Sequence, residues 1–244
     1  LRCARSGRGA AGAEASVALW ADSTYGYLEA GQVMGLAADM GFPLASFTCT
    51  YGAGLATRGD ESACAARSAA RVVVIEMGYN DDSGLSADEA AKRMRKQDWF
   101  ATLSKDATAV ERVIFIAQPG YRQVAGAARK RKKSASSFVS GQLIEGSTWT
   151  TNAARLVREE LGIEAIVFDA PAEEIYAGFI RDEAGTLWQD KTRCRSYTSH
   201  GIEYSEDGSP ALWCDAQHPS ASGAEAHFRL LAEALKKRFG DFFD

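Results

Sequence analysis

The sequence lacks several features that would place it in a special class of protein. No apolar run approaches the roughly 18 to 20 residues needed to span a bilayer, because the longest runs are only strand-sized. Basic residues are not in excess, since 28 Lys and Arg stand against 32 Asp and Glu. Nucleic-acid-binding proteins usually carry a clear basic excess. We therefore expect no nucleic-acid partner.

Cysteine is scarce and scattered. The five cysteines are Cys3, Cys49, Cys64, Cys194 and Cys214. They contain no Cys-x-x-Cys pair, so their spacing indicates no zinc site. Composition leaves two alternatives open, namely reduced thiols in a cytosolic protein or disulfide bridges in an exported one.

What the sequence does contain is an ordinary globular composition, with 46% hydrophobic and 25% charged residues over 244 positions. A chain of this size buries enough surface to fold without a metal or disulfide staple. We expect a single domain over residues 1–244, with irregular insertions at about 121–140 and 170–214. The first residue is Leu1 rather than Met, so we expect a mature product or an excised piece of a longer chain.

Apolar runs and helical patterns alternate along the chain. The predicted strands are Ser16–Trp20, Pro43–Thr48, Arg71–Met77, Glu111–Ala117 and Glu164–Asp169. The predicted helices are Tyr25–Met40, Glu61–Ala70, Ser86–Thr108, Ser147–Leu161 and Ala221–Phe239. Such an alternation indicates a parallel sheet covered on both faces. We therefore expect a three-layer α/β/α sandwich around a doubly wound, flavodoxin-like sheet of five parallel strands.

Helix ends carry recognisable signals. Ser86 and Glu89 have the spacing of a capping box, and so do Ser222 and Glu225. Gly162 is placed to end the helix before it. These signals predict where three of the helices begin or end.

Polar residues and glycines follow the predicted strands. Ser23 follows the first, Gly52 and Gly54 the second, and Asn80 the third. The segment Asp215–His218 lies just before the last helix. Each has a common structural explanation as a cap or turn residue. Sites in doubly wound sheets nevertheless form where the strands end, so these residues are predicted to converge there.

These residue types suit acyl transfer through a serine. A serine hydroxyl needs a base to take its proton, and Asp215 lies three residues before His218, a spacing that lets the carboxylate orient the ring toward Ser23. The amide of Ser23, the amide of a glycine after the second strand (Gly52, or less favoured Gly54) and the side chain of Asn80 are the predicted oxyanion hole. This chemistry needs no metal and no organic cofactor.

Several other residues near these motifs have simpler interpretations. Asp22 is interpreted as a support of the turn that carries Ser23. His200 and His227 are interpreted as surface residues. Tyr25, like the other two tyrosines beside the motifs, is either part of a pocket wall or a packing residue.

The motifs together resemble those of the SGNH (GDSL-type) hydrolase superfamily. Ala21–Ser23 is similar to its Gly-Asp-Ser block, with Ala21 in place of glycine, and Gly52 is similar to its single-glycine block. Gly78–Asp81 matches Gly-x-Asn-Asp, and Asp215–His218 matches Asp-x-x-His. The resemblance implies that Ser23, Asp215 and His218 are catalytic.

A narrower resemblance concerns the flanking residues. Leu19–Ser23 and Gly208–His218 are similar to SGNH domains fused behind membrane acyltransferase family-three proteins. This implies O-acetyl transfer to a bacterial envelope glycan, with an acyl donor, a carbohydrate acceptor and a membrane acyltransferase domain missing from this chain as partners. It also implies an extracytoplasmic location, in the periplasm or at the cell surface, and disulfides among the first four cysteines. A cytoplasmic location stays open.

Two further functional hypotheses remain. One is a stand-alone esterase or deacetylase that hydrolyses short acyl esters. The other, of a different class, is a non-catalytic glycan-binding domain that keeps the fold without turnover.

Overall fold

A computed structural model describes ten segments of the chain. These are residues 2–5, 16–25, 28–50, 53–56, 70–77, 81, 86–105, 109–117, 142–168 and 221–242, with backbone alone for 2–5, 23, 142–148, 222 and 242. The predicted helix Glu61–Ala70 (apart from its last residue) and the expected insertions at 121–140 and 170–214 lie outside these segments.

Six strands form one sheet. They are β1 (Arg2–Arg5), β2 (Val17–Ala21), β3 (Leu44–Cys49), β4 (Val72–Glu76), β5 (Arg112–Ile116) and β6 (Glu164–Phe168), in the order β1-β3-β2-β4-β5-β6. Strands β2 to β6 are parallel, which confirms the five predicted strands and the doubly wound topology. Strand β1 was not predicted, and it pairs antiparallel with β3.

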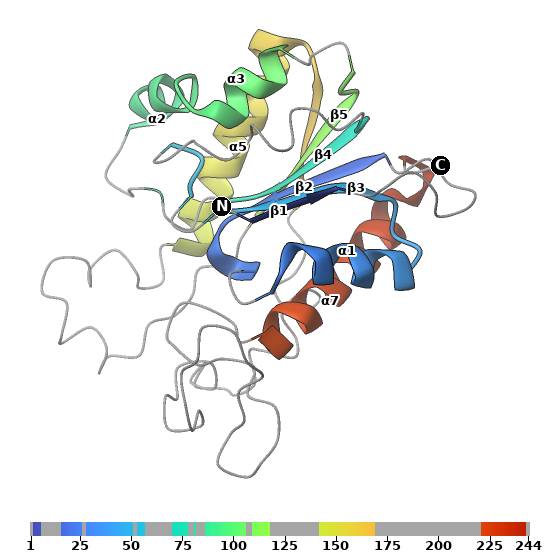
Figure 1. The fold of residues 1–244 in the computed structure, drawn as a ribbon. Helices are drawn as coiled ribbons and strands as arrows, with labels where there is room; N and C mark the ends of the chain where they lie inside the picture. Colours follow the sequence, from blue (N-terminus) through green and yellow to red (C-terminus); the bar gives the residue numbers. More distant parts are fainter. Residues whose placement is uncertain are drawn as a thin grey trace, which may run out of the picture.

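Helices cover both faces of the sheet, as the three-layer prediction requires (Figure 1). Helices α1 (Ala30–Asp39) and α7 (Ala221–Phe239) lie on one face. Helices α2 (Ala87–Met94), α3 (Asp98–Lys105) and α5 (Gln142–Leu161) lie on the other. Two short 3-10 helices, η1 (Ser23–Tyr25) and η5 (Gly240–Phe242), follow β2 and α7. None of the helices in the described segments has the length and apolar character to cross a bilayer.

Neighbouring residues of each strand enter different cores, because successive side chains point to opposite faces. Leu19 lies in the core beneath α1 and α7, whereas Trp20 lies in the core beneath α2, α3 and α5. All five residues of β4 are buried, and so are all five of β2. This two-sided burial explains why these strands are almost continuously apolar.

The predicted long helix over Ser86–Thr108 was wrong in one respect, because the structure divides it into α2 and α3. The backbone amides of Lys96 and Gln97 bond to carbonyl oxygens three residues earlier, which tightens the turn and ends α2. The break turns Trp99 into the core. The predicted start of α2 is confirmed, since Ser86 and Glu89 form the reciprocal bonds of a capping box.

The other two end signals had different outcomes. Gly162 follows α5 with a φ of +68°, as the prediction of a helix end requires. The predicted cap at Ser222 was wrong, because α7 already begins at Ala221. Glu225 pairs instead with Arg229 one turn further along the helix, at 2.9 Å.

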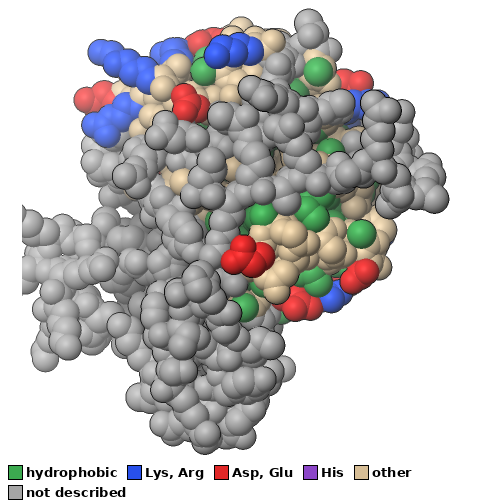
Figure 2. Space-filling view, in the orientation of Figure 1, with side chains coloured by type: hydrophobic (Ala, Val, Ile, Leu, Met, Phe, Trp, Pro, Cys, Tyr) green, Lys and Arg blue, Asp and Glu red, His purple; other side chains and the backbone are tan. Residues whose placement is uncertain are grey.

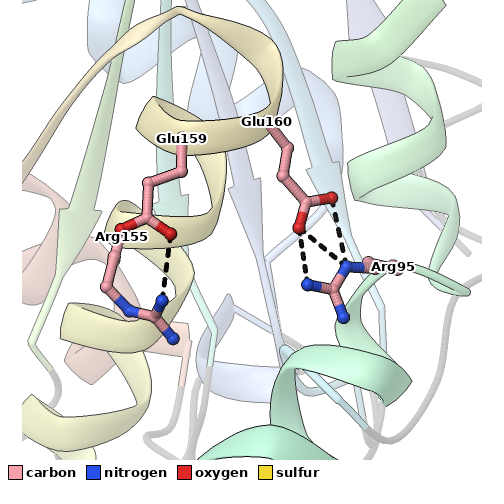
Figure 3. Close-up of polar contacts among 4 residues, drawn as sticks. All are labelled: Arg95, Arg155, Glu159 and Glu160. Atoms are coloured by element: carbon pink, nitrogen blue, oxygen red, sulfur yellow. Dashed lines mark hydrogen bonds and ion pairs between the residues drawn. The ribbon is translucent and has the colours of Figure 1, made fainter.

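Two ion pairs lie on the outer surface of α5, and one of them joins this helix to the end of α2 (Figure 3). Arg95, at the end of α2, donates three hydrogen bonds to the carboxylate of Glu160 on α5, two of them to Oε1 at 2.5 and 2.8 Å and one to Oε2 at 3.1 Å. These bonds lower the pKa of Glu160. Arg155 and Glu159 form a second pair along α5 at 3.0 Å. Both pairs are solvent-exposed, so they contribute little to stability.

The surface over α2 carries charges of both signs. In Figure 2, Lys and Arg side chains lie among Asp and Glu side chains over this helix. Asp88 and Glu89 lie in its first turn, and Lys92 and Arg93 in its last. Each charge therefore lies at the helix end where the macrodipole favours it.

Two glycines give a matched test of backbone strain. Neither Gly162, at a φ of +68°, nor Gly35, inside α1, has an atom within 4 Å of the position of an added Cβ. Gly162→Ala should lower the free energy of unfolding by about 1 kcal/mol, because alanine resists a left-handed backbone. Gly35→Ala should raise it by up to about 1 kcal/mol, because alanine favours a helix. Urea unfolding measures both; equal effects of the two changes would contradict this assignment.

Candidate active site

A buried carboxylate holds the turn that carries Ser23. Strand β2 ends at Ala21, and the backbone of Ser23 lies in η1 directly after it. Asp22 is 1% exposed, and its Oδ1 accepts hydrogen bonds from the backbone N–H of Thr24 at 2.9 Å and from its hydroxyl at 2.7 Å. The interpretation of Asp22 as a support of this turn is confirmed.

The carboxyl ends of three neighbouring strands are joined by backbone hydrogen bonds. The N–H of Asp22 donates to the carbonyl oxygen of Glu76, the last residue of β4, at 3.1 Å. The N–H of Thr50, just after β3, donates to the carbonyl oxygen of Ala21 at 3.0 Å. The segments that lead to Gly52, Ser23 and Asn80 therefore leave β3, β2 and β4 side by side.

A second carboxylate joins two of these segments. Asp81, next to the predicted Asn80, accepts hydrogen bonds from the backbone N–H groups of Leu55 and Ala56, each at 2.7 Å. Trp99 of α3 donates from its indole to the carbonyl oxygen of Leu55 at 2.9 Å. Asp81 was predicted only as part of a motif. The structure shows that it binds the chain after β3 to the chain after β4.

Three titratable side chains meet in the core beneath the turn. Glu76 accepts a hydrogen bond from the Tyr25 hydroxyl on Oε2 at 2.8 Å, and His227 Nε2 lies 2.6 Å from its Oε1. The exposed fraction of each of the three residues is 0%. A neutral or a charged imidazole can donate from Nε2, so we assign this contact as a donation to the carboxylate.

The interpretation of His227 as a surface residue was therefore wrong. Ala224 lies three residues before it and Leu231 four residues after it on α7, and both are buried. Residues at this spacing share one face of a helix, so His227 faces the sheet. That spacing is the sequence signal that would have placed it in the core.

Of the two interpretations of Tyr25, the structure favours packing, because the side chain is fully buried in the core. Its ring lies edge-on to Phe47 at a centroid distance of 5.5 Å, and it also contacts the rings of His227 and Phe228. Burial raises the pKa of Tyr25 well above its usual 10.0, and the adjacent carboxylate of Glu76 raises it further. Tyr25 is therefore neutral, and its hydroxyl donates a hydrogen bond to Glu76.

Cys49 carries a thiol that donates to the carbonyl oxygen of Asp22 at 3.0 Å. It therefore takes no part in the disulfides that were expected among the first four cysteines. The structure does not describe the other cysteines beyond the backbone of Cys3, namely Cys64, Cys194 and Cys214. The thiol contributes instead to the same turn, because its acceptor lies next to Ser23.

The remaining predicted site residues stay predictions. Gly52, Asn80, Asp215 and His218 all lie outside the described segments, as does the side chain of Ser23. His200 and the tyrosines at 51 and 79 also lie outside them. Within the described segments, no group of three His, Cys, Asp or Glu side chains is arranged to hold a metal ion.

Comparison with known proteins gives likenesses at low identity. No family model and no curated protein matches the sequence. Solved structures similar to the chain include a GDSL-like lipase from Bacteroides thetaiotaomicron (12% identity, TM-score 0.41, covering 93% of this chain and 90% of that one). They also include an extracellular lipase from Streptomyces rimosus (16%, 0.42, 90% and 99%) and phospholipase A1 from Streptomyces albidoflavus (14%, 0.42, 92% and 100%).

At such identities and TM-scores, the likenesses establish neither the reaction nor the substrate of this chain.

The raised pKa of Tyr25 predicts a loss of stability in alkali. In the unfolded chain Tyr25 loses its proton near pH 10, whereas the folded protein keeps it. The stabilisation is therefore complete below pH 10 and falls as the pH rises further, by about 1.4 kcal/mol per pH unit. Urea unfolding between pH 9 and 11.5 should show this slope in the wild type and a shallower one in Tyr25→Phe. Identical slopes would contradict the assignment.

Proposed function

We propose that this chain catalyses acyl-ester chemistry with Ser23 as its nucleophile. The observation that supports this most directly is the set of hydrogen bonds between the ends of β3, β2 and β4. The three motifs expected to supply Gly52, Ser23 and Asn80 follow these ends directly. Sites of doubly wound sheets form at this edge, where strand ends converge.

In the proposed reaction, His218 takes the hydroxyl proton of Ser23 while the serine oxygen attacks the ester carbonyl. Asp215 accepts a hydrogen bond from the other ring nitrogen and orients the imidazole. The amides of Ser23 and Gly52 and the side chain of Asn80 donate to the oxyanion. The carbon–oxygen bond to the leaving alcohol then breaks, the alcohol receives the proton from His218, and the acyl group remains on Ser23.

The second half of the reaction repeats these steps with a new hydroxyl. His218 deprotonates the incoming hydroxyl, which attacks the acyl-enzyme, and Ser23 recovers its proton. Water as the acceptor gives hydrolysis, and a sugar hydroxyl gives transfer. The acceptor that reaches the site therefore decides between esterase and transferase activity.

The described turn supports a preorganised nucleophile. Asp22 binds Thr24 twice, and both its N–H and its carbonyl oxygen are bonded to neighbouring elements. Catalysis by fixed donors depends on geometry that is set before the substrate arrives. A turn held by this many bonds keeps the Ser23 amide in place for that role.

For the acceptor, we propose a bacterial envelope glycan that receives an O-acetyl group. The support is the narrower resemblance of Leu19–Ser23 and Gly208–His218 to domains fused to membrane acyltransferases. In this proposal a membrane acyltransferase domain delivers the acyl donor, and the chain described here acts outside the cytoplasm.

A serine-reactive phosphonate tests the nucleophile. We expect the wild type to gain the mass of one phosphonyl group at Ser23, and Ser23→Ala to gain none. Ser23→Ala should also lower turnover of p-nitrophenyl acetate by about 10⁴-fold or more, as the loss of a catalytic serine does. Intact-mass spectrometry and the release of nitrophenol measure these effects.

Ser104→Ala is the matched control, because Ser104 lies exposed on α3. It should label and turn over as the wild type does. Equal labelling of Ser23→Ala would assign the nucleophile to another residue and overturn the proposal. Wild-type protein without labelling or turnover would favour the non-catalytic glycan-binding alternative.

Acceptor competition tests transfer. With p-nitrophenyl acetate as the donor and short envelope oligosaccharides as acceptors, we expect acetylated sugar by mass spectrometry and faster release of nitrophenol. The sugar should accelerate release because it intercepts an acyl-enzyme that water cleaves slowly. Acetate as the sole product with every acceptor would favour the stand-alone esterase, and Ser23→Ala serves as the blank.

A further inference from the structure

We propose that Glu76 is a positioning residue for this site, and that its buried carboxylate sets the relative placement of the elements leading to Ser23, Asn80 and His218. This inference rests on the proposed function. It assigns a role to three side chains, Tyr25, Glu76 and His227, that the reaction itself does not use.

Glu76 contacts both ends of the turn that carries Ser23. Its carbonyl oxygen accepts a hydrogen bond from the N–H of Asp22 at 3.1 Å, just before Ser23. Its carboxylate accepts one from the hydroxyl of Tyr25 at 2.8 Å, just after the turn. A single residue therefore fixes the entry and the exit of the four-residue segment that contains Ser23.

The same carboxylate holds helix α7. Its second oxygen lies 2.6 Å from Nε2 of His227, and Phe228 packs edge-on against the ring of Tyr25 at 6.3 Å. Helix α7 begins at Ala221, only three residues after His218. A shift of His227 along or around the helix axis would therefore move the start of α7, to which the proposed base is joined.

Glu76 is also the last residue of β4, and Asn80 follows four residues later. The position of Glu76 itself is fixed by the sheet, because β4 pairs with β2 up to the register Ala21↔Glu76. The sheet thus holds the carboxylate of Glu76 in place. Its hydrogen bonds to Tyr25 and His227 then fix the positions of η1 and α7 relative to the sheet.

The buried carboxylate of Glu76 favours one relative placement of η1 and α7 over others. A carboxylate with 0% exposure is costly unless hydrogen-bond donors replace the lost water. Tyr25 and His227 both contribute to this, and they come from different elements, so a relative slip of η1 and α7 breaks at least one of these two contacts. An apolar contact tolerates such slips far better, because it has no preferred direction.

Tyr25→Phe isolates the hydroxyl while keeping the ring. We expect kcat for p-nitrophenyl acetate to fall roughly 10- to 100-fold, because small displacements of reacting groups have effects of that size. KM should change by less than about 2-fold, because substrate binding does not involve Tyr25, and the phosphonate should still label Ser23 alone, more slowly.

Phe42→Leu is the matched control for loss of stability. Phe42 packs against Phe228 in the same core at 6.2 Å but lies outside the hydrogen-bonded network. We expect Phe42→Leu to lower the thermal midpoint with kcat retained. If Tyr25→Phe also lowers the midpoint and leaves kcat unchanged, the network is structural only and the inference is wrong.

A pair of changes at His227 keeps the test valid should Tyr25→Phe fail to fold. His227→Gln retains an N–H donor for Glu76, whereas His227→Met has a similar size and none. We expect His227→Gln to keep kcat within a few-fold of the wild type and His227→Met to lose at least about 10-fold. Equal kcat values for the two variants would overturn the positioning role.

These outcomes are separable from failure of the proposed function. If Ser23→Ala keeps wild-type turnover, the assignment of the nucleophile fails regardless of the network. If Ser23→Ala is inactive while the Tyr25 and His227 variants match their controls, the proposed function stands and only the role of Glu76 fails.

Discussion

A negative charge placed in the interior imposes the strictest requirement on this fold. The carboxylate of Glu76 receives one donor from 51 residues earlier in the chain and another from 151 residues later. Neither contact is local, so neither forms until β2, β4 and α7 have assembled. The apolar cores supply most of the driving force for that assembly. The directional bonds to Glu76 then select one arrangement among the many that hydrophobic packing alone tolerates.

Acidic side chains accept hydrogen bonds at three points along the edge of the sheet where the parallel strands end. Asp22 binds the N–H and hydroxyl of Thr24, Asp81 binds the amides of Leu55 and Ala56, and Glu76 binds Tyr25 and His227. Asp22 and Asp81 accept hydrogen bonds from backbone N–H groups beyond the strand ends, whereas Glu76 contacts two side chains, so each carboxylate binds two donors at once. The acidic residues thus hold the segments after the strands in place, in addition to giving them negative charge.

The sequence predicts what depends on local pattern. The run Val72–Glu76 identifies a buried strand, and Ser86 with Glu89 identifies a helix start. Long-range contacts are harder to predict. Strand β1 pairs with residues far along the chain, from Arg2 with Cys49 to Arg5 with Ser46, and His227 contacts Glu76 across 151 residues. Ser23 is located only by its backbone, and its meeting with Asp215 and His218 remains a prediction from motifs.

Strand β1 has a consequence for how copies of this protein meet. It covers the outer side of β3, whose unpaired amides and carbonyls would otherwise offer a template to another chain. Strand β1 is only four residues long, with Arg2 and Arg5 at its ends. A strand this short offers few backbone groups for pairing, so this flank of the sheet discourages continuous β-pairing between molecules and the aggregation that follows from it.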